Sequence, residues 1–134
     1  MIINSQIKLT ILLSLCCLFI PQVSHAKDYT VTEIVKDLNH PWSLAFLPNN
    51  DMLVTERPGR LRLISKDRLI EQQISGLPEI YAEGQGGLFD VLVDPDFVDN
   101  QRLFIAYAAG NRSENALTVI SARLDAMALH DIKI

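Results

Sequence analysis

Cysteine is absent from the chain after residue 17, and both cysteines, Cys16 and Cys17, lie in an apolar N-terminal stretch. A chain cleaved after that stretch has no thiol, which excludes disulfide bonds and thiolate chemistry. The sequence also lacks a basic cluster. After residue 26, 11 of the 12 basic residues and all 16 acidic residues remain, which gives a formal net charge of −5. Because polyanion binding requires clustered Lys and Arg, we expect no nucleic-acid partner.

The first 26 residues have the three-part pattern of a secretory signal. Residues 1–8 carry one positive charge, residues 9–20 are almost wholly apolar, and Ser24 and Ala26 place small residues where a signal peptidase cleaves. The apolar run is too short to span a bilayer, which needs about 20 residues. We therefore expect a signal peptide over residues 1–26, a periplasmic or secreted protein, and no membrane anchor after cleavage. A lipoprotein signal ending at one of the two cysteines is the alternative.

No stretch of ten residues after residue 26 has the 3.6-residue period of an amphipathic helix. The sequence instead predicts short strands separated by turn residues, so the predicted fold class is all-β. Pro58 and Gly59 are placed for a type II turn that begins at Arg57. The expected strands cover residues 29–35, 42–47, 52–55, 60–63, 68–74, 88–93, 102–108, 116–124 and 129–134.

Two parts of the chain resemble each other. Residues 44–48 match residues 91–95 at an offset of 47, and residues 52–54 match residues 103–105 at an offset of 51. About four strands per 45 to 50 residues is the blade period of a β-propeller; a β-sandwich with similar strand spacing is the alternative. A propeller closes with roughly four to eight blades. Residues 27–134 provide about two, so the sequence predicts the N-terminal part of an incomplete propeller domain.

The segment with the most distinctive chemistry is residues 84–91, GQGGLFDV, in which three glycines surround Gln85. Glycine lets a backbone approach another group closely. A glutamine amide both donates and accepts hydrogen bonds, which suits sugar hydroxyls or a quinone carbonyl, but it cannot act as a base. The alternative interpretation is a Gly-rich turn that opens a strand and leaves Gln85 solvated.

The other polar candidates are interpreted as structural. Glu56 and Arg57 stand at a strand end, where a salt bridge that ties the blade to its turn is favoured over substrate contact. His40 is expected at the entry to a strand, and Trp42 is expected in the core between blades. The carboxylates of residues 90–99 lack the spacing and the glycine of an EF-hand loop, so we expect them to form turns.

Four stretches, in order along the chain, resemble soluble aldose dehydrogenases of the glucose/sorbosone type that use pyrroloquinoline quinone. They are residues 40–48, 53–61, 84–91 and 94–97, within a match that runs from about residue 38 to about residue 107. The resemblance implies a six-bladed propeller. It also implies a quinoprotein oxidoreductase that oxidises the anomeric carbon of an aldose sugar to a lactone, with pyrroloquinoline quinone and calcium as cofactors.

The resemblance carries one site residue onto this chain. In that family the glutamine of the Gly-Gln-Gly-Gly segment lies beside the cofactor and sugar site, and this role falls on Gln85. The family's catalytic histidine, its basic quinone-binding residues and its calcium ligands come from later blades, and His130 stands in an unlike context. No catalytic or metal-binding residue is therefore assigned, and the 134-residue chain by itself is expected to be inactive. A non-catalytic propeller binding module and a metal-dependent, lactonase-like propeller are the alternative functions.

Overall fold

The structure, a computed structural model, describes residues 29–134. Residues 33–134 form one compact unit, and residues 29–32 are grouped with the N-terminal segment. The predicted signal peptide lies outside the described residues. Within the described part of the chain, no helix is both long and apolar enough to cross a membrane.

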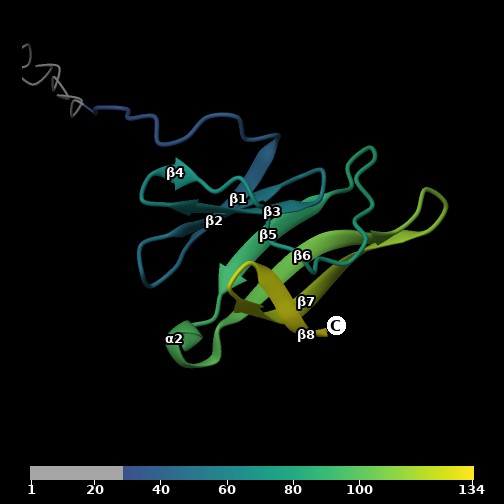
Figure 1. The fold of residues 1–134 in the computed structure, drawn as a ribbon. Coiled ribbons are helices and arrows are strands. Elements are labelled where there is room, and N and C mark those ends of the chain that lie inside the picture. The colour runs from purple at the N-terminus through teal and green to yellow at the C-terminus, as the bar shows by residue number, and fades with distance from the viewer. Residues whose placement is uncertain (1–28) are drawn as a thin grey trace, which may run out of the picture. The chain divides into compact units, whose positions relative to one another are not determined.

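Two four-stranded antiparallel sheets make up the compact unit (Figure 1). Each strand pairs with its neighbour in the chain, so each sheet is an up-and-down meander, the form of a propeller blade. The all-β fold and its two blades are therefore as predicted. The first sheet contains β1 (Pro41–Phe46), β2 (Met52–Glu56), β3 (Arg60–Ser65) and β4 (Arg68–Leu69). The second contains β5 (Leu88–Val93), β6 (Arg102–Gly110), β7 (Asn115–Asp125) and β8 (Ala128–Lys133), with a one-turn helix, α2 (Phe97–Asn100), between β5 and β6.

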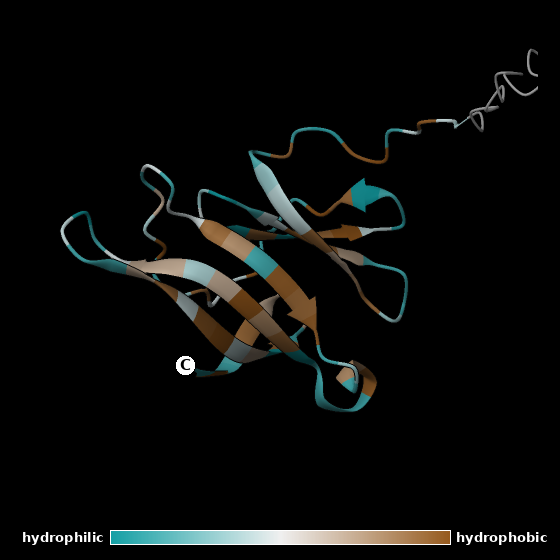
Figure 2. Cartoon of the chain, turned by 180° about the vertical axis from the view of Figure 1, so that it is seen from behind, coloured by the Kyte–Doolittle hydropathy of each residue, from teal (hydrophilic) through white to brown (hydrophobic). Residues whose placement is uncertain are grey.

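The hydrophobic core lies between the two sheets. Leu53 of β2 and Leu61 of β3 are fully buried there against residues of the second sheet. In β6, Leu103 and Ile105 are fully buried, whereas Phe104 between them is 37% exposed. This alternation is that of a strand with one covered face. Figure 2 shows that the strands of the second sheet are mostly apolar and the loops that join them mostly polar.

The sequence repeat has a geometric counterpart. Leu53 and Phe104 are equivalent at the offset of 51, in the second strand of each sheet. Leu53 packs between the sheets, whereas Phe104 lies on the far face of the second sheet. At the next pair of equivalent positions, Val54 and Ile105, the two faces are exchanged. Ile105 packs between the sheets, whereas Val54 lies on the far face of the first sheet. Equivalent faces of the two sheets thus point the same way around the fold, as in successive propeller blades.

One predicted strand is wrong. Residues 29–35 form no strand, and Tyr29 and Val31 are 83% and 94% exposed. Alternation gives a segment a strand-like face, but a strand also needs a partner for its N–H and C=O groups, and no described strand pairs with this segment. The strand expected over residues 68–74 is also shorter than predicted: β4 has two residues, and a single bridge between Leu61 and Ile74 follows it.

The turn between β2 and β3 begins one residue earlier than predicted. The backbone N–H of Gly59 donates to the carbonyl oxygen of Glu56 over 2.9 Å, so the turn spans residues 56–59 and not 57–60. Gly59 then adopts a φ of 107° before the strand resumes at Arg60. The left-handed backbone explains why glycine stands at this position.

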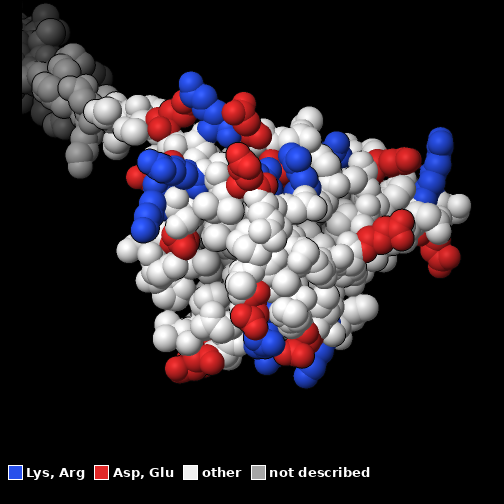
Figure 3. All heavy atoms as spheres, viewed as in Figure 1, with Lys and Arg blue, Asp and Glu red and all other residues white. Residues whose placement is uncertain are grey.

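Charged side chains lie mainly at the periphery of the fold. Figure 3, in the view of Figure 1, shows acidic and basic groups interspersed around the rim, with an uncharged centre. At one exposed site, Arg123 of β7 lies 3.3 Å from Asp125 and 3.0 Å from Asp131 of β8. Its guanidinium lowers the pKa of the Asp131 carboxyl, mainly through their hydrogen bond. Because the pair is exposed, we expect it to add little to stability.

Candidate functional site

The loop that carries Gln85 enters β5 from a tightly fixed turn. The N–H of Gly86 donates to the carbonyl oxygen of Glu83 (2.8 Å), and the carbonyl oxygen of Gly87 accepts from the N–H of Ala108 (2.9 Å). Gln85 itself is exposed. The loop therefore presents one long amide side chain at the surface from a backbone that is anchored on its C-terminal side.

Two glycines are required because other backbone atoms approach the loop closely. A Cβ at Gly86 would lie 2.4 Å from the carbonyl oxygen of Tyr81. A Cβ at Gly87 would lie 2.4 Å from Cγ of Arg57 and 2.7 Å from its carbonyl oxygen. These separations are too short for any side chain, so the close approach predicted for the Gly-rich segment is present. The groups approached are the protein's own, namely Tyr81 in the segment before the loop and Arg57 just after β2.

Thr55 near the end of β2 and Arg57 just after it connect the first sheet to the Gln85 loop. Thr55 is fully buried, and its hydroxyl donates to the carbonyl oxygen of Phe89, at the irregular start of β5. The same hydroxyl oxygen accepts from the N–H of Ser43 (3.0 Å). Two residues further, Arg57 donates through Nη1 to the carbonyl oxygens of Gly84 and Gly86, each over 3.0 Å. The end of β2 is therefore the support on which the loop rests.

Glu56, between these two residues, makes a buried charge cluster on the far face of the first sheet. Its carboxylate is fully buried, with Oε2 2.6 Å from Nε of Arg60 and 3.6 Å from Nη1 of Arg62. Its Oε1 accepts from the N–H of Asn39. The salt bridge predicted at this strand end is present for Glu56, but its partners lie on β3 and not in the turn. Arg57 does not share in it, because its guanidinium bonds to main-chain oxygens of the loop.

Gln85 lines a shallow groove between its own loop and the start of β7. The groove has a volume of about 390 Å³, and its lining includes Tyr81, Glu83, Phe89 and Asn115. This volume lies within the range of roughly 300 to 1,000 Å³ that is usual for small-ligand sites. The lining combines aromatic rings with amide and carboxylate groups, which can bind hydroxyl-rich or flat, polar ligands.

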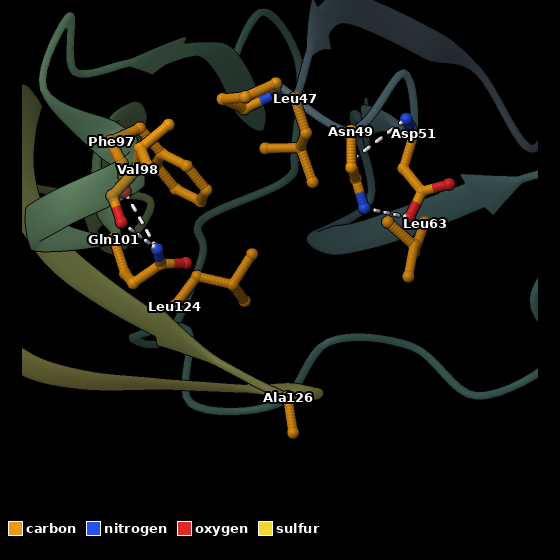
Figure 4. Close-up of a pocket in the computed structure, with 10 residues that line it drawn as sticks. Leu47, Asn49, Asp51, Leu63, Phe97, Val98, Gln101, Leu124 and Ala126 are labelled. Carbon is orange, nitrogen blue, oxygen red and sulfur yellow. Dashed lines mark hydrogen bonds between the residues drawn. The ribbon is translucent and has the colours of Figure 1, made fainter.

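A larger groove, about 470 Å³, lies between the sheets at the opposite end of β2 (Figure 4). Its polar side chains are occupied locally. The Asn49 amide donates to the Asp51 carboxylate (2.8 Å), and the Gln101 amide donates to the carbonyl oxygens of Phe97 and Val98. The rest of the lining is mostly apolar. No set of free polar groups converges on a ligand there, so the smaller groove is the better candidate.

The remaining sequence candidates are not among the residues that line the Gln85 groove. His40 is exposed; its ring bonds to Asn39, and its carbonyl oxygen accepts from the N–H of Arg57 (3.0 Å), a structural role. His130 is exposed on β8. The prediction that Trp42 is a core residue is wrong, because Trp42 is 57% exposed. Its ring packs against that of Phe89, with ring centroids 5.6 Å apart.

Asp94 and Asp96 form a turn after β5, as predicted, whereas Asp90 lies within β5 and Asp99 within α2. Oδ1 of Asp94 accepts from the backbone N–H of Asp96 (2.9 Å). This bond, followed by one from Asn100, lowers the pKa of the Asp94 carboxyl. Among residues 29–134, no group of three or more His, Cys, Asp or Glu side chains is arranged to hold a metal ion.

Comparisons with known proteins agree on one family. A family model described as Glucose / Sorbosone dehydrogenase matches residues 38–134. The aldose sugar dehydrogenase YliI of Escherichia coli (strain K12) is 45% identical over 78 residues, which cover 57% of this chain and 21% of that protein. The quinoprotein glucose dehydrogenase B of Acinetobacter calcoaceticus is 29% identical over 84 residues, 60% of this chain and 18% of that protein.

A solved structure described as a glucose dehydrogenase has the same fold over this region. Its TM-score is 0.73 at 43% sequence identity, and the match covers 78% of this chain and 32% of that one. The match therefore spans about a fifth of each of these curated relatives and about a third of the solved structure.

Proposed function

The chain belongs to the glucose/sorbosone dehydrogenase family, and from this premise we propose that it supplies part of the sugar site of a quinone-dependent aldose dehydrogenase. The proposed reaction oxidises the anomeric carbon of an aldose to a lactone. The names of two relatives, an aldose sugar dehydrogenase and a quinoprotein glucose dehydrogenase, support this substrate class and cofactor type.

The observation that carries the proposal is the exposed Gln85 side chain at the edge of a groove, on a loop whose backbone is anchored. A preorganised amide binds a hydroxyl or carbonyl group with little ordering cost, because the loop is already fixed. We propose that Gln85 orients the sugar or the quinone by one donated and one accepted hydrogen bond. The residue cannot take the proton from the sugar, so the base is a different group.

The groove fits only part of the quinone. Its aromatic side chains, Tyr81 and Phe89, suit a flat ring, and Gln85 suits a carbonyl oxygen. The quinone also carries carboxylates, but the lining holds the Glu83 carboxylate and no Lys or Arg. We therefore assign to this chain a contact with the ring or the sugar and not the binding of the carboxylates. When bound, the quinone supplies the electron acceptor for the reaction.

Export is part of the proposal. The pattern of residues 1–26 supports removal of a signal peptide and a periplasmic or secreted location. Calcium also belongs to the proposal through the family resemblance, with its ligands outside the residues that the structure describes.

A chimeric enzyme tests the role of Gln85. Residues 38–134 of this chain would replace the matching segment of the E. coli aldose sugar dehydrogenase, and dye-linked sugar oxidation would be measured with added pyrroloquinoline quinone and calcium. We expect an active chimera in which Gln85→Ala lowers kcat/KM by roughly 10- to 100-fold, the worth of one or two well-placed hydrogen bonds. The 134-residue polypeptide alone, which is expected to oxidise no sugar, provides the background rate of the assay.

The matched control is Gln73→Ala, which removes another exposed glutamine, from the segment after β4. It should leave kcat/KM unchanged. A folded chimera that binds sugar without oxidising it would favour the binding-module alternative. Full activity of the Gln85→Ala chimera would show that Gln85 has no part in the site.

A further inference from the structure

Arg57 is held at three points around the Gln85 loop. Its N–H donates to the carbonyl oxygen of His40 (3.0 Å), and its own carbonyl oxygen accepts from the N–H of Leu88 (2.9 Å). Its guanidinium Nη1 donates to the carbonyl oxygens of Gly84 and Gly86, each over 3.0 Å. The main chain of Arg57 is thus fixed by the residue before β1 and by the first residue of β5. Its side chain reaches the two carbonyl groups that stand on either side of Gln85.

We propose that Arg57 is a positioning residue, which sets the conformation of the loop and hence the direction of the Gln85 side chain. The inference rests on the proposed function in so far as Gln85 meets the sugar or the quinone. A hydrogen bond from a guanidinium is stronger than one between neutral groups. Two such bonds from one nitrogen fix two peptide groups relative to each other.

The loop needs this restraint on its N-terminal side. At Gly86 and Gly87 the close approach of Tyr81 and Arg57 already fixes the backbone. Gly84 has no such neighbour, since a Cβ there would meet nothing within 4 Å. A glycine in open space samples many conformations. The bond from Arg57 to the Gly84 carbonyl oxygen is therefore what restrains the residue directly before Gln85.

The same geometry argues against a direct contact of this nitrogen with a ligand. An Nη nitrogen carries two hydrogens. Nη1 of Arg57 bonds to two carbonyl oxygens, so it has no hydrogen left for a substrate. Arg57 is also not among the residues that line the Gln85 groove, so its effect on the sugar site is expected to pass through Gln85.

Loop order in the 134-residue chain tests the inference without reference to catalysis. Amide hydrogen exchange and NMR order parameters would be measured for residues 84–88 in Arg57→Ala and Arg57→Lys. We expect the Gly86 amide to exchange roughly 10-fold faster in Arg57→Ala, with core amides such as those of Leu53 and Ile105 unchanged. Arg57→Lys keeps a charged donor and should loosen the loop less. Arg68→Ala, which removes an exposed arginine from β4, is the matched control.

A double-mutant cycle in the chimeric enzyme separates positioning from independent action. If Arg57 acts through Gln85, the double variant Arg57→Ala/Gln85→Ala has the same kcat/KM as Gln85→Ala alone, because coupled residues are not additive. Additive losses would overturn the inference. Unchanged exchange at residues 84–86 in Arg57→Ala would also overturn it, even if Gln85 proves essential. If exchange at residues 84–86 is faster in Arg57→Ala but Gln85→Ala leaves kcat/KM unchanged, Arg57 restrains the loop and only the proposed function is rejected.

Discussion

Replacing Glu56 with glutamine is expected to lower the free energy of unfolding by about 3 to 5 kcal/mol, the usual cost of removing one partner from a buried ion pair. The Glu56 carboxylate is fully buried, and the Arg62 side chain beside it is 9% exposed. A neutral amide leaves the Arg62 guanidinium in the interior without its counter-charge. Urea unfolding of the 27–134 polypeptide, followed by circular dichroism, would measure the change.

The control for Glu56→Gln is Asp131→Asn, which removes a carboxylate from an exposed pair with Arg123. Water solvates both partners of that pair, so the control should unfold at nearly the same urea concentration as the unsubstituted polypeptide. The prediction depends on burial and not on the number of ion pairs. Equal urea midpoints for Glu56→Gln and Asp131→Asn would show that the buried Glu56 ion pairs stabilise the fold no more than a surface ion pair does.

The far face of the second sheet, on the side away from the first sheet, is apolar and exposed. Leu92 is 65% exposed, Leu117 71% and Val119 54%, and Phe104 lies on the same face. Exposed apolar sheet faces of this kind drive association. We expect the 27–134 polypeptide to self-associate at micromolar concentration, and the double variant Leu117→Lys/Val119→Lys to be largely monomeric. Analytical ultracentrifugation would measure the change in mass.

A matched control tests whether any added charge produces the same result. Val98→Lys places a lysine at a residue that is 69% exposed on α2, away from this face. It should leave the association unchanged. Loss of association in this control, or a monomer without any substitution, would contradict a role for the far face of the second sheet.

The sequence predicted most strands because their signals are local. The alternation in β6 and the turn residues before β2 and after β5 depend only on neighbours in the chain. The repeat at offsets of 47 and 51 also identified the blades before any contact was known. The helix α2 has four residues, too few for a 3.6-residue period to reveal it. The strand predicted at residues 29–35 is wrong because alternation cannot supply a pairing partner.

For the site, the sequence by itself determined that a Gly-rich segment carries one amide side chain, Gln85, because glycine and glutamine have that chemistry wherever they stand. The tertiary structure decided what holds the loop. Arg57 reaches Gly84 across 27 residues, and Thr55 reaches Phe89 across 34. Such bonds form only after the sheets have packed, so no spacing within the sequence specifies them. The local sequence at the end of β2 therefore predicts only a strand followed by a turn. In the fold, this part of the chain supports the Gln85 loop.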